Sequence, residues 1–235
     1  MRSDSETDIG GPDGRFPSTQ ISLLEAAAGG LSNGALDRVI AMYWKPVYRF
    51  IRLKFRKKNE DAKDLTQAFF AGAIEREILA RFDPARASFR TYLRMAVERF
   101  AANEYAAENR QKRGGGMSFE PVDEQSAAAA AESPEQVFER EWQRELLALA
   151  LDDLRAFCEI SGKQLQFRIF EAYDLAEETR PSYASLAAEH GLTEATVTNY
   201  LAWARRTLRA MATERMRGVT PDERELRDEM RRVWI

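Results

Sequence analysis

The chain has 235 residues, of which 44% are hydrophobic, so it is long enough to bury one large core or two small ones. Its formal net charge is -3, whereas a protein that binds DNA unaided is usually basic overall. Cys158 is the only cysteine, which excludes an intrachain disulfide, and no apolar segment has the length of a membrane anchor. We therefore expect a cytoplasmic protein without membrane association, in which any DNA contact rests on local basic patches or is assisted by a partner.

The N-terminal part begins with a polar tail. Residues 1–18 are rich in Gly, Asp and Ser, which predicts disorder. Apolar spacing then predicts a short helix over residues 21–27 and a second helix that begins near Ala35. Pro46 lies inside the second pattern, so we expect it either to kink this helix or to separate it from the next one.

Two further helices are predicted before residue 113. The first runs from about Glu60 to Leu79, and the second follows Ser88, a favourable N-cap residue. Apolar residues of the second recur from Phe89 to Phe100 at the spacing of one helix face, the clearest amphipathic pattern in the chain. No segment shows convincing strand alternation. The sequence therefore predicts an all-α fold.

A change of composition divides the chain. Residues 114–133 are rich in Gly, Ala and acids and lack periodic bulky residues, which predicts a flexible linker. We expect one helical domain over residues 19–113 and a second over 134–212. The second opens on a strong helix start at Ser133-Pro134, and residues 213–235 form a helical extension, expected to pack on that domain.

The second domain contains a predicted helix-turn-helix. Ser182 caps its first helix, Gly191 provides the left-handed turn, and Thr193 caps its second helix. We expect the exposed face of that second helix to meet base edges with its first half and phosphates with its later arginines. The candidate DNA-binding residues on it are Glu194, Thr196, Thr198, Asn199, Trp203, Arg205, Arg206 and Arg209.

The first domain contains two candidate binding surfaces. Asp61, Asp64 and Gln67 follow one another at helical spacing and form a polar ridge that suits a basic partner surface. The second surface combines arginines with aromatic residues, although most of these aromatic rings are expected in the core. The candidate base-contact residues are Arg86 and Ser88 in a loop and Arg90, Asn103 and Arg110 on the polar face of the following helix.

The order of these segments resembles that of extracytoplasmic-function (ECF) sigma factors of the sigma-70 family. Residues 61–70 resemble the segment that grips the polymerase clamp. Residues 89–116 resemble the helix that melts the promoter and reads its −10 element, and residues 182–197 look like the helix-turn-helix that reads the −35 element. The resemblance covers about residues 20–211 and implies sigma domains 2 and 4 without the middle domain.

This resemblance implies a transcription initiation factor. Asp61, Asp64 and Gln67 would dock on the clamp helices of the polymerase β′ subunit. The second domain would contact the flap of the β subunit through apolar residues such as Phe138 and Leu146. Core RNA polymerase and promoter DNA are the implied partners, and an anti-sigma factor is a further candidate. The net negative charge of the chain is compatible with such a factor, because RNA polymerase provides most of the DNA affinity of the complex.

Two other functions remain open at this point. A helix-turn-helix regulator independent of polymerase would dimerise on a palindromic site. A helical adaptor without a DNA role would tolerate charge reversal at Arg205 and Arg206. An enzyme is the least favoured class, since no catalytic constellation, cofactor motif or Cys/His metal pattern occurs.

Overall fold

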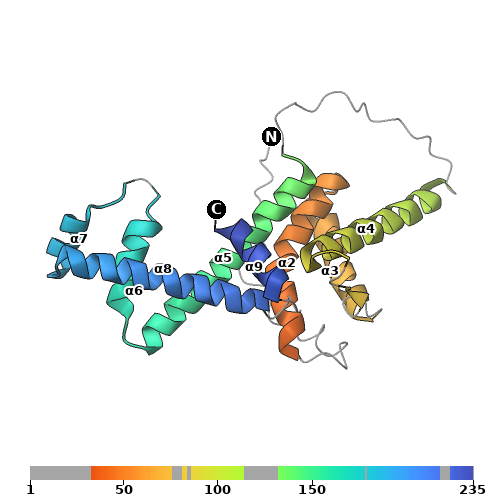
Figure 1. Ribbon diagram of the computed structural model, residues 1–235. Coiled ribbons are helices and arrows are strands. Elements are labelled where there is room, and N and C mark those ends of the chain that lie inside the picture. Colours follow the sequence, from red (N-terminus) through yellow and green to blue (C-terminus); the bar gives the residue numbers. More distant parts are fainter. Residues whose placement is uncertain are drawn as a thin grey trace, which may run out of the picture. The chain divides into compact units, whose positions relative to one another are not determined.

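A computed structural model describes residues 33–75, 81–83, 86–113, 132–177, 179–217 and 223–234. Within these ranges all regular secondary structure is helical, which confirms the predicted fold class (Figure 1). The predicted tail, the short helix at 21–27 and residues 114–131 of the predicted linker lie outside the described residues. None of the described helices is both long and apolar enough to cross a membrane.

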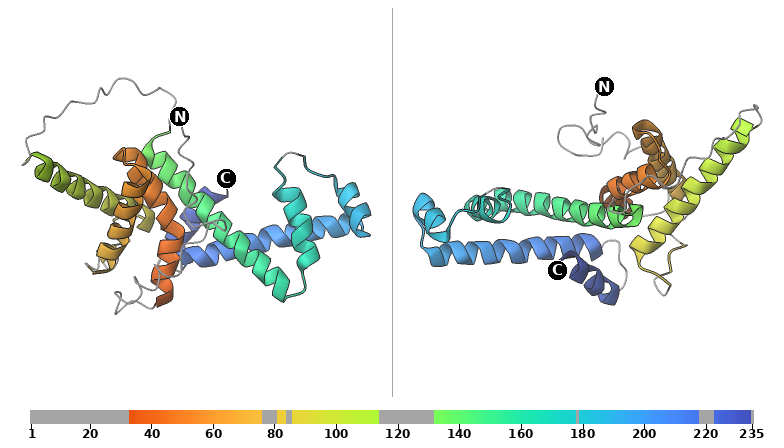
Figure 2. Two further views of the ribbon diagram at one scale, coloured as in Figure 1. Left: turned by 180° about the vertical axis from the view of Figure 1, so that it is seen from behind. Right: turned by 90° about the horizontal axis from the view of Figure 1, so that it is seen from above.

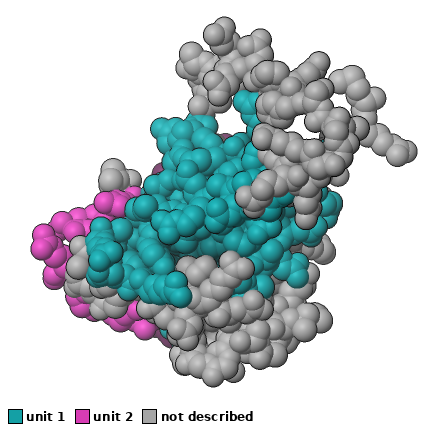
Figure 3. Space-filling view, turned by 90° about the vertical axis from the view of Figure 1, so that its right-hand side faces the viewer, with its two compact units in different colours: residues 1–145 teal, residues 146–235 magenta. Residues whose placement is uncertain are grey.

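The chain divides into two compact units, residues 1–145 and 146–235 (Figure 3). This division falls inside one continuous helix, α5 (Pro134–Ile160), and not at its start, where the sequence pattern placed the domain boundary. The difference arises because the first turns of α5 pack into the core of the first unit. Each unit is described separately below.

Three helices form the body of the first unit: α2 (Asn33–Lys54), α3 (Asn59–Glu75) and α4 (Phe89–Arg113). Helix α2 runs through Pro46 without interruption, so the proline does not separate two helices. The three helices pack against one another. Their buried side chains include Tyr43 and Phe50 of α2, Phe69 of α3 and Leu93 of α4, which form an aromatic-rich core.

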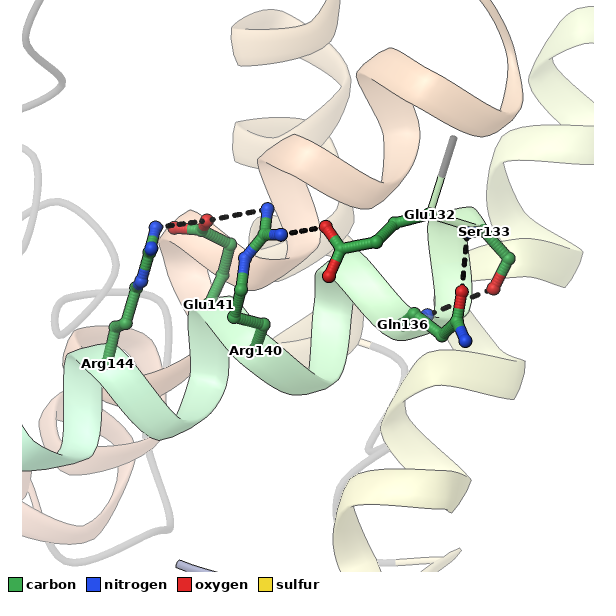
Figure 4. Close-up of polar contacts among 6 residues, drawn as sticks. All are labelled: Glu132, Ser133, Gln136, Arg140, Glu141 and Arg144. Carbon is green, nitrogen blue, oxygen red and sulfur yellow. Dashed lines mark hydrogen bonds and ion pairs between the residues drawn. The ribbon is translucent and has the colours of Figure 1, made fainter. Parts of the chain in front are cut away.

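The start of α5 is fixed by a reciprocal cap (Figure 4). The backbone N–H of Gln136 donates to Oγ of Ser133 at 3.1 Å, and the backbone N–H of Ser133 donates to Oε1 of Gln136 at 2.8 Å. This is the capping box that the sequence predicts at this position. Further along, Arg140 forms ion pairs with Glu132 and with the buried Glu141.

The first turns of α5 contribute aromatic side chains to the core of the first unit. Phe138 is fully buried, stacked on Tyr43 with ring centroids 6.4 Å apart and edge-on to Phe50 at 5.9 Å. Lys54 of α2 forms an ion pair of 2.8 Å with Glu135. Burial of such rings is the main stabilising contribution that a helix of this length can add.

The second unit contains the rest of α5 and four further helices: α6 (Gln164–Asp174), α7 (Tyr183–His190), α8 (Glu194–Arg217) and α9 (Glu223–Val233) (Figure 2). Helices α6, α7 and α9 all pack on α8, which bears a buried stripe at helical spacing. The stripe consists of Val197, Leu201, Ala204, Leu208, Ala212 and Met216.

One contact and one buried side chain belong to the later part of α5, which lies in this unit. Asp153 accepts two hydrogen bonds from Arg215 of α8, the longer of them 2.7 Å. Cys158 is 1% exposed, and its burial raises the pKa of its thiol. The extension after residue 212 belongs to the same unit, where Leu226 and Met230 of α9 are buried. The expectation that it packs on its own domain is thereby confirmed.

Candidate functional site

The predicted polymerase-binding ridge lies on the outer face of α3. Asp61, Asp64 and Gln67 are all exposed, whereas Ala62 and Thr66 between them are buried. The hydroxyl of Thr66 donates to the carbonyl oxygen of Ala62 at 2.7 Å, which satisfies it inside the helix. The three polar residues therefore form one continuous surface, as the helical spacing predicts.

The loop candidates for −10 contact occupy the approach to α4. Arg86 is exposed over 86% of its side chain and forms an ion pair of 3.1 Å with Asp83. Ser88 has a structural role, because its Oγ accepts the backbone N–H of Thr91 at 3.3 Å and so caps the helix. Of the two, Arg86 is the side chain that this structure leaves accessible to a nucleic acid.

Arg90 does not lie on the protein surface, where the sequence pattern places it. The expectation that it lies on the exposed polar face is wrong, because Arg90 is only 4% exposed. Its guanidinium carbon lies 4.1 Å from the centroid of the Trp142 ring, and its Nε forms an ion pair of 2.8 Å with Glu139. The first turns of α5 thus cover this arginine in a cation–π stack.

The later part of α4 carries the remaining candidates of the first unit. Asn103 is exposed, as expected. Arg110 belongs to the last turns of α4, and its side chain lies outside the described residues. Met95 and Tyr105 are also exposed, at 52% and 41%, and the ring of Tyr105 lies 5.6 Å from Nζ of Lys57. An exposed aromatic ring beside a cation is a combination that can stack on an unpaired base.

Helices α7 and α8 of the second unit, joined by a short turn, lie where the sequence predicts a helix-turn-helix. Oγ of Ser182 accepts the backbone N–H of Ser185 at 3.0 Å, and Gly191 ends α7 with φ of 65°. Oγ1 of Thr193 then accepts the backbone N–H of Thr196 at 3.2 Å and caps α8. Each of these local signals was predicted from the sequence, because capping and left-handed turns depend on short-range geometry.

The first turn of α8 presents several of the −35 candidates. Glu194, Thr198 and Asn199 are exposed, and Thr196 is half-buried beside the cap residue Thr193. The hydroxyl of Thr198 donates to the carbonyl oxygen of Glu194 at 2.9 Å. Asn199 has an amide side chain with a donor and an acceptor, the chemistry that reads an adenine edge in a major groove.

Two other candidates on α8 are engaged within the protein. Trp203 is half-buried, with its ring 6.4 Å from that of Phe157 and 4.6 Å from Nζ of Lys163. Arg205 donates two hydrogen bonds, of 2.9 and 2.8 Å, to the carboxylate of Asp174. These hydrogen bonds raise the pKa of Arg205 and fix its guanidinium on α6.

The last two candidates on α8 differ in their surroundings. Arg206 is exposed, and the structure gives it no ion pair with any described residue. Arg209 is exposed too, and its guanidinium carbon lies 5.1 Å from the ring centroid of Trp234, just after α9. Arg206 is therefore the arginine on this face that can pair with a phosphate without losing a partner.

The expected apolar contact surface for the flap is buried. Phe138 and Leu146 are both 0% exposed, so neither is available to another protein in this structure. Three other apolar side chains are exposed in the second unit: Phe157 at 40%, Ile160 at 89% and Leu175 at 39%. Sequence reasoning missed them because they continue the apolar pattern of helices that also bury residues.

Comparison of the sequence with known protein families shows which family the first unit resembles. Residues 39–111 match the family model of sigma-70 region 2. The matched region 2 segment begins in α2, includes all of α3 and ends near the end of α4, so it contains both the exposed ridge and the −10 candidates. Searches of curated proteins and of solved structures found no match to the chain.

The region 2 match covers part of the first unit and none of the second. The part of the first unit that matches is thus similar to sigma-70 region 2. Among the described residues, no group of His, Cys, Asp and Glu side chains is arranged to hold a metal ion.

Proposed function

We propose that this protein is a sigma factor of the ECF type, which binds core RNA polymerase and directs it to promoters. The single observation that carries the proposal is the region 2 match over residues 39–111, within which α3 presents an exposed ridge. Its acidic residues Asp61 and Asp64, with Gln67, would dock on the clamp helices of the β′ subunit. The protein would act in the cytoplasm, where polymerase is found.

The first unit would also open the −10 element. Residues 81–88 and the outer face of α4 would hold an unstacked base, with Arg86, Asn103 and Arg110 as its polar contacts. Unstacking costs a few kcal/mol per base, which stacking on exposed rings and hydrogen bonds to the base edge would offset. The covered Arg90 would join this surface only if the first turns of α5 moved away.

The second unit would act as sigma domain 4. Helix α8 would enter the major groove of the −35 element, with Asn199 at base edges and Arg206 at a phosphate. The two-helix geometry with its three local caps supports this assignment. The exposed side chains Phe157, Ile160 and Leu175 are the surface that would meet the flap of the β subunit. An anti-sigma factor would compete for either surface.

Binding to core polymerase tests the proposal. The variants are Asp61→Lys and Asp64→Lys, alone and combined, with Glu189→Lys as a matched control at an exposed acid on α7, outside both proposed polymerase contacts. We expect the double variant to lose at least about tenfold in affinity, because two attractive charge contacts become repulsive. The control should bind core polymerase as the natural chain does.

The outcome also separates the other functions. If the natural chain fails to bind core polymerase but forms a dimer on a palindromic duplex, it is a polymerase-independent regulator. If it binds neither polymerase nor DNA, the adaptor function is favoured. Retention of core binding by the Asp61→Lys/Asp64→Lys variant would contradict the assigned docking surface.

A further inference from the structure

A groove with basic walls lies between the last turns of α8 and helix α9. Its volume is about 410 Å³, within the range of small-molecule sites. Arg209, Thr213 and Arg217 form one wall, at the four-residue spacing that places them on one face of α8. Leu226 and Met230 of α9 form an apolar floor. None of the surfaces proposed above includes α9.

The opposite wall adds two further cations. Arg227 and Arg231 of α9 line the groove and are both exposed. Arg231 forms a 3.4 Å ion pair with Asp228, whereas no acid is paired with Arg227 among the described residues. Four guanidinium groups therefore surround one cavity, and Glu223 is the only acid among the described residues that line it.

The polar groups of this groove are almost all hydrogen-bond donors. Guanidinium groups have no acceptor, and Glu223 already accepts from Nε of Arg217 at 3.1 Å. The indole N–H of Trp234 is buried and has no hydrogen-bond partner among the described atoms. The hydroxyl of Thr213 already donates to the carbonyl oxygen of Arg209 at 2.7 Å. A lining made almost entirely of hydrogen-bond donors favours a ligand whose polar atoms are hydrogen-bond acceptors.

The electrostatics agree with an anionic ligand. The hydrogen bonds that Arg217 donates to Glu214 and to Glu223 raise its pKa, so the groove wall keeps a charged guanidinium there. Arg209 stacks on the ring of Trp234, which holds its guanidinium plane in place. A positioned guanidinium edge matches two oxygens of one phosphate, and this fit favours phosphate over a smaller or single-oxygen acceptor.

We propose that the α8–α9 groove binds a phosphate ester, with Arg209, Arg227 and Arg231 as phosphate contacts and Trp234 as an additional donor. The phosphate could come from a free nucleotide, whose base would cover the apolar floor, or from the backbone of duplex DNA. The proposal goes beyond the sigma-type function and does not depend on it, because no residue of the α3 ridge takes part.

Calorimetry on the full chain at low salt tests the groove. The probes are pyrophosphate, ATP, a 16-base-pair duplex of arbitrary sequence and a tetraglutamate peptide. The variants are Arg227→Ala/Arg231→Ala and Trp234→Phe, and the control is Arg168→Ala, an exposed arginine on α6 without a described partner. Thermal denaturation checks that each variant folds.

We expect the double arginine variant to weaken binding of a phosphate probe at least about tenfold, as the loss of a charge-assisted hydrogen bond requires. Trp234→Phe should weaken it about threefold, since it keeps the ring and removes only one neutral donor. Arg168→Ala should leave the affinity unchanged.

The probes distinguish the two sources of phosphate. Saturable ATP or pyrophosphate binding that depends on Arg227 and Arg231 identifies a free phosphate ester. Duplex binding with the same dependence, without ATP binding, identifies backbone contact. The proposal is wrong if only tetraglutamate binds, if no phosphate probe responds to the double variant, or if Arg168→Ala weakens binding equally. None of these readouts involves polymerase, so a failure here leaves the proposed function standing.

Discussion

The stack of Arg90 on Trp142 gives the sharpest test of where the first unit ends. The perturbation is a double-mutant cycle of Arg90→Ala and Trp142→Ala in the full chain. Trp142 is fully buried, and a tryptophan buries up to about 250 Å², which at about 25 cal/mol/Å² corresponds to about 6 kcal/mol. Because the cavity partly relaxes, we expect Trp142→Ala to lower the free energy of unfolding by about 4 kcal/mol.

The coupling energy carries more information than either single value. A desolvated cation–π contact is worth about 2 kcal/mol, so the two substitutions should deviate from additivity by at least about 1 kcal/mol. Urea denaturation followed by far-ultraviolet circular dichroism measures each variant without relying on tryptophan fluorescence. Glu139 is 40% exposed and remains solvated when Arg90 is removed, which keeps the cycle interpretable.

A coupling energy within about 0.5 kcal/mol of zero would refute this reasoning. In that case Trp142 would belong to the second domain, as the sequence pattern indicates, and Arg90 would be free to contact DNA. A large coupling together with an unchanged promoter affinity of Arg90→Ala would instead assign Arg90 a purely structural role.

Three further outcomes follow from the described contacts. Gly191→Ala should lower the free energy of unfolding of the second unit by about 1–2 kcal/mol, which thermal denaturation measures. The φ angle of Gly191 is 65°, and an added Cβ would meet no atom within 4 Å, so the destabilisation comes from backbone strain alone. The pKa of Glu135 is lowered chiefly by its hydrogen bond to Lys54. This pair therefore stabilises the fold at pH values above the ordinary carboxyl pKa of 4.5, and the contribution is lost as the pH falls through the lower pKa of the folded state. A pH series of urea midpoints for Glu135→Gln should lack that acid-side loss, and an unaltered pH profile would contradict the pairing. Arg206→Ala should weaken binding to a −35 duplex and reduce the slope of log affinity against log salt concentration by about 1. Arg205→Ala should change this slope less, because Arg205 is paired with Asp174. Fluorescence anisotropy at several salt concentrations measures both variants, and equal slopes would contradict the assignment.

Local signals were predictable from the sequence because their physics is short-range. The cap at Ser182, the left-handed Gly191 and the reciprocal cap at Ser133 all involve residues within a few positions of one another. The exposed ridge of Asp61 and Asp64 follows equally from helical spacing. These features needed no knowledge of how helices pack.

Assignments that depend on packing between distant segments were not predictable. The apolar pattern of α5 continues from Phe138 through Leu154 without a break, so it cannot tell which core receives each turn. Arg90 is charged, so the sequence pattern places it on the surface. In the structure the ring of Trp142, which is distant in the sequence, covers it. The basic groove of α9 escaped notice for the same reason, because its two walls are brought together only by the fold.

The buried thiol of Cys158 offers a way to observe one unit alone. A thiol with a raised pKa inside a core reacts slowly with alkylating reagents until the surrounding structure opens. Its labelling rate would therefore follow opening of the unit formed by residues 146–235, whatever happens to residues 1–145. The natural chain thus carries a chemical probe for the opening of its second unit, and no engineered label is required.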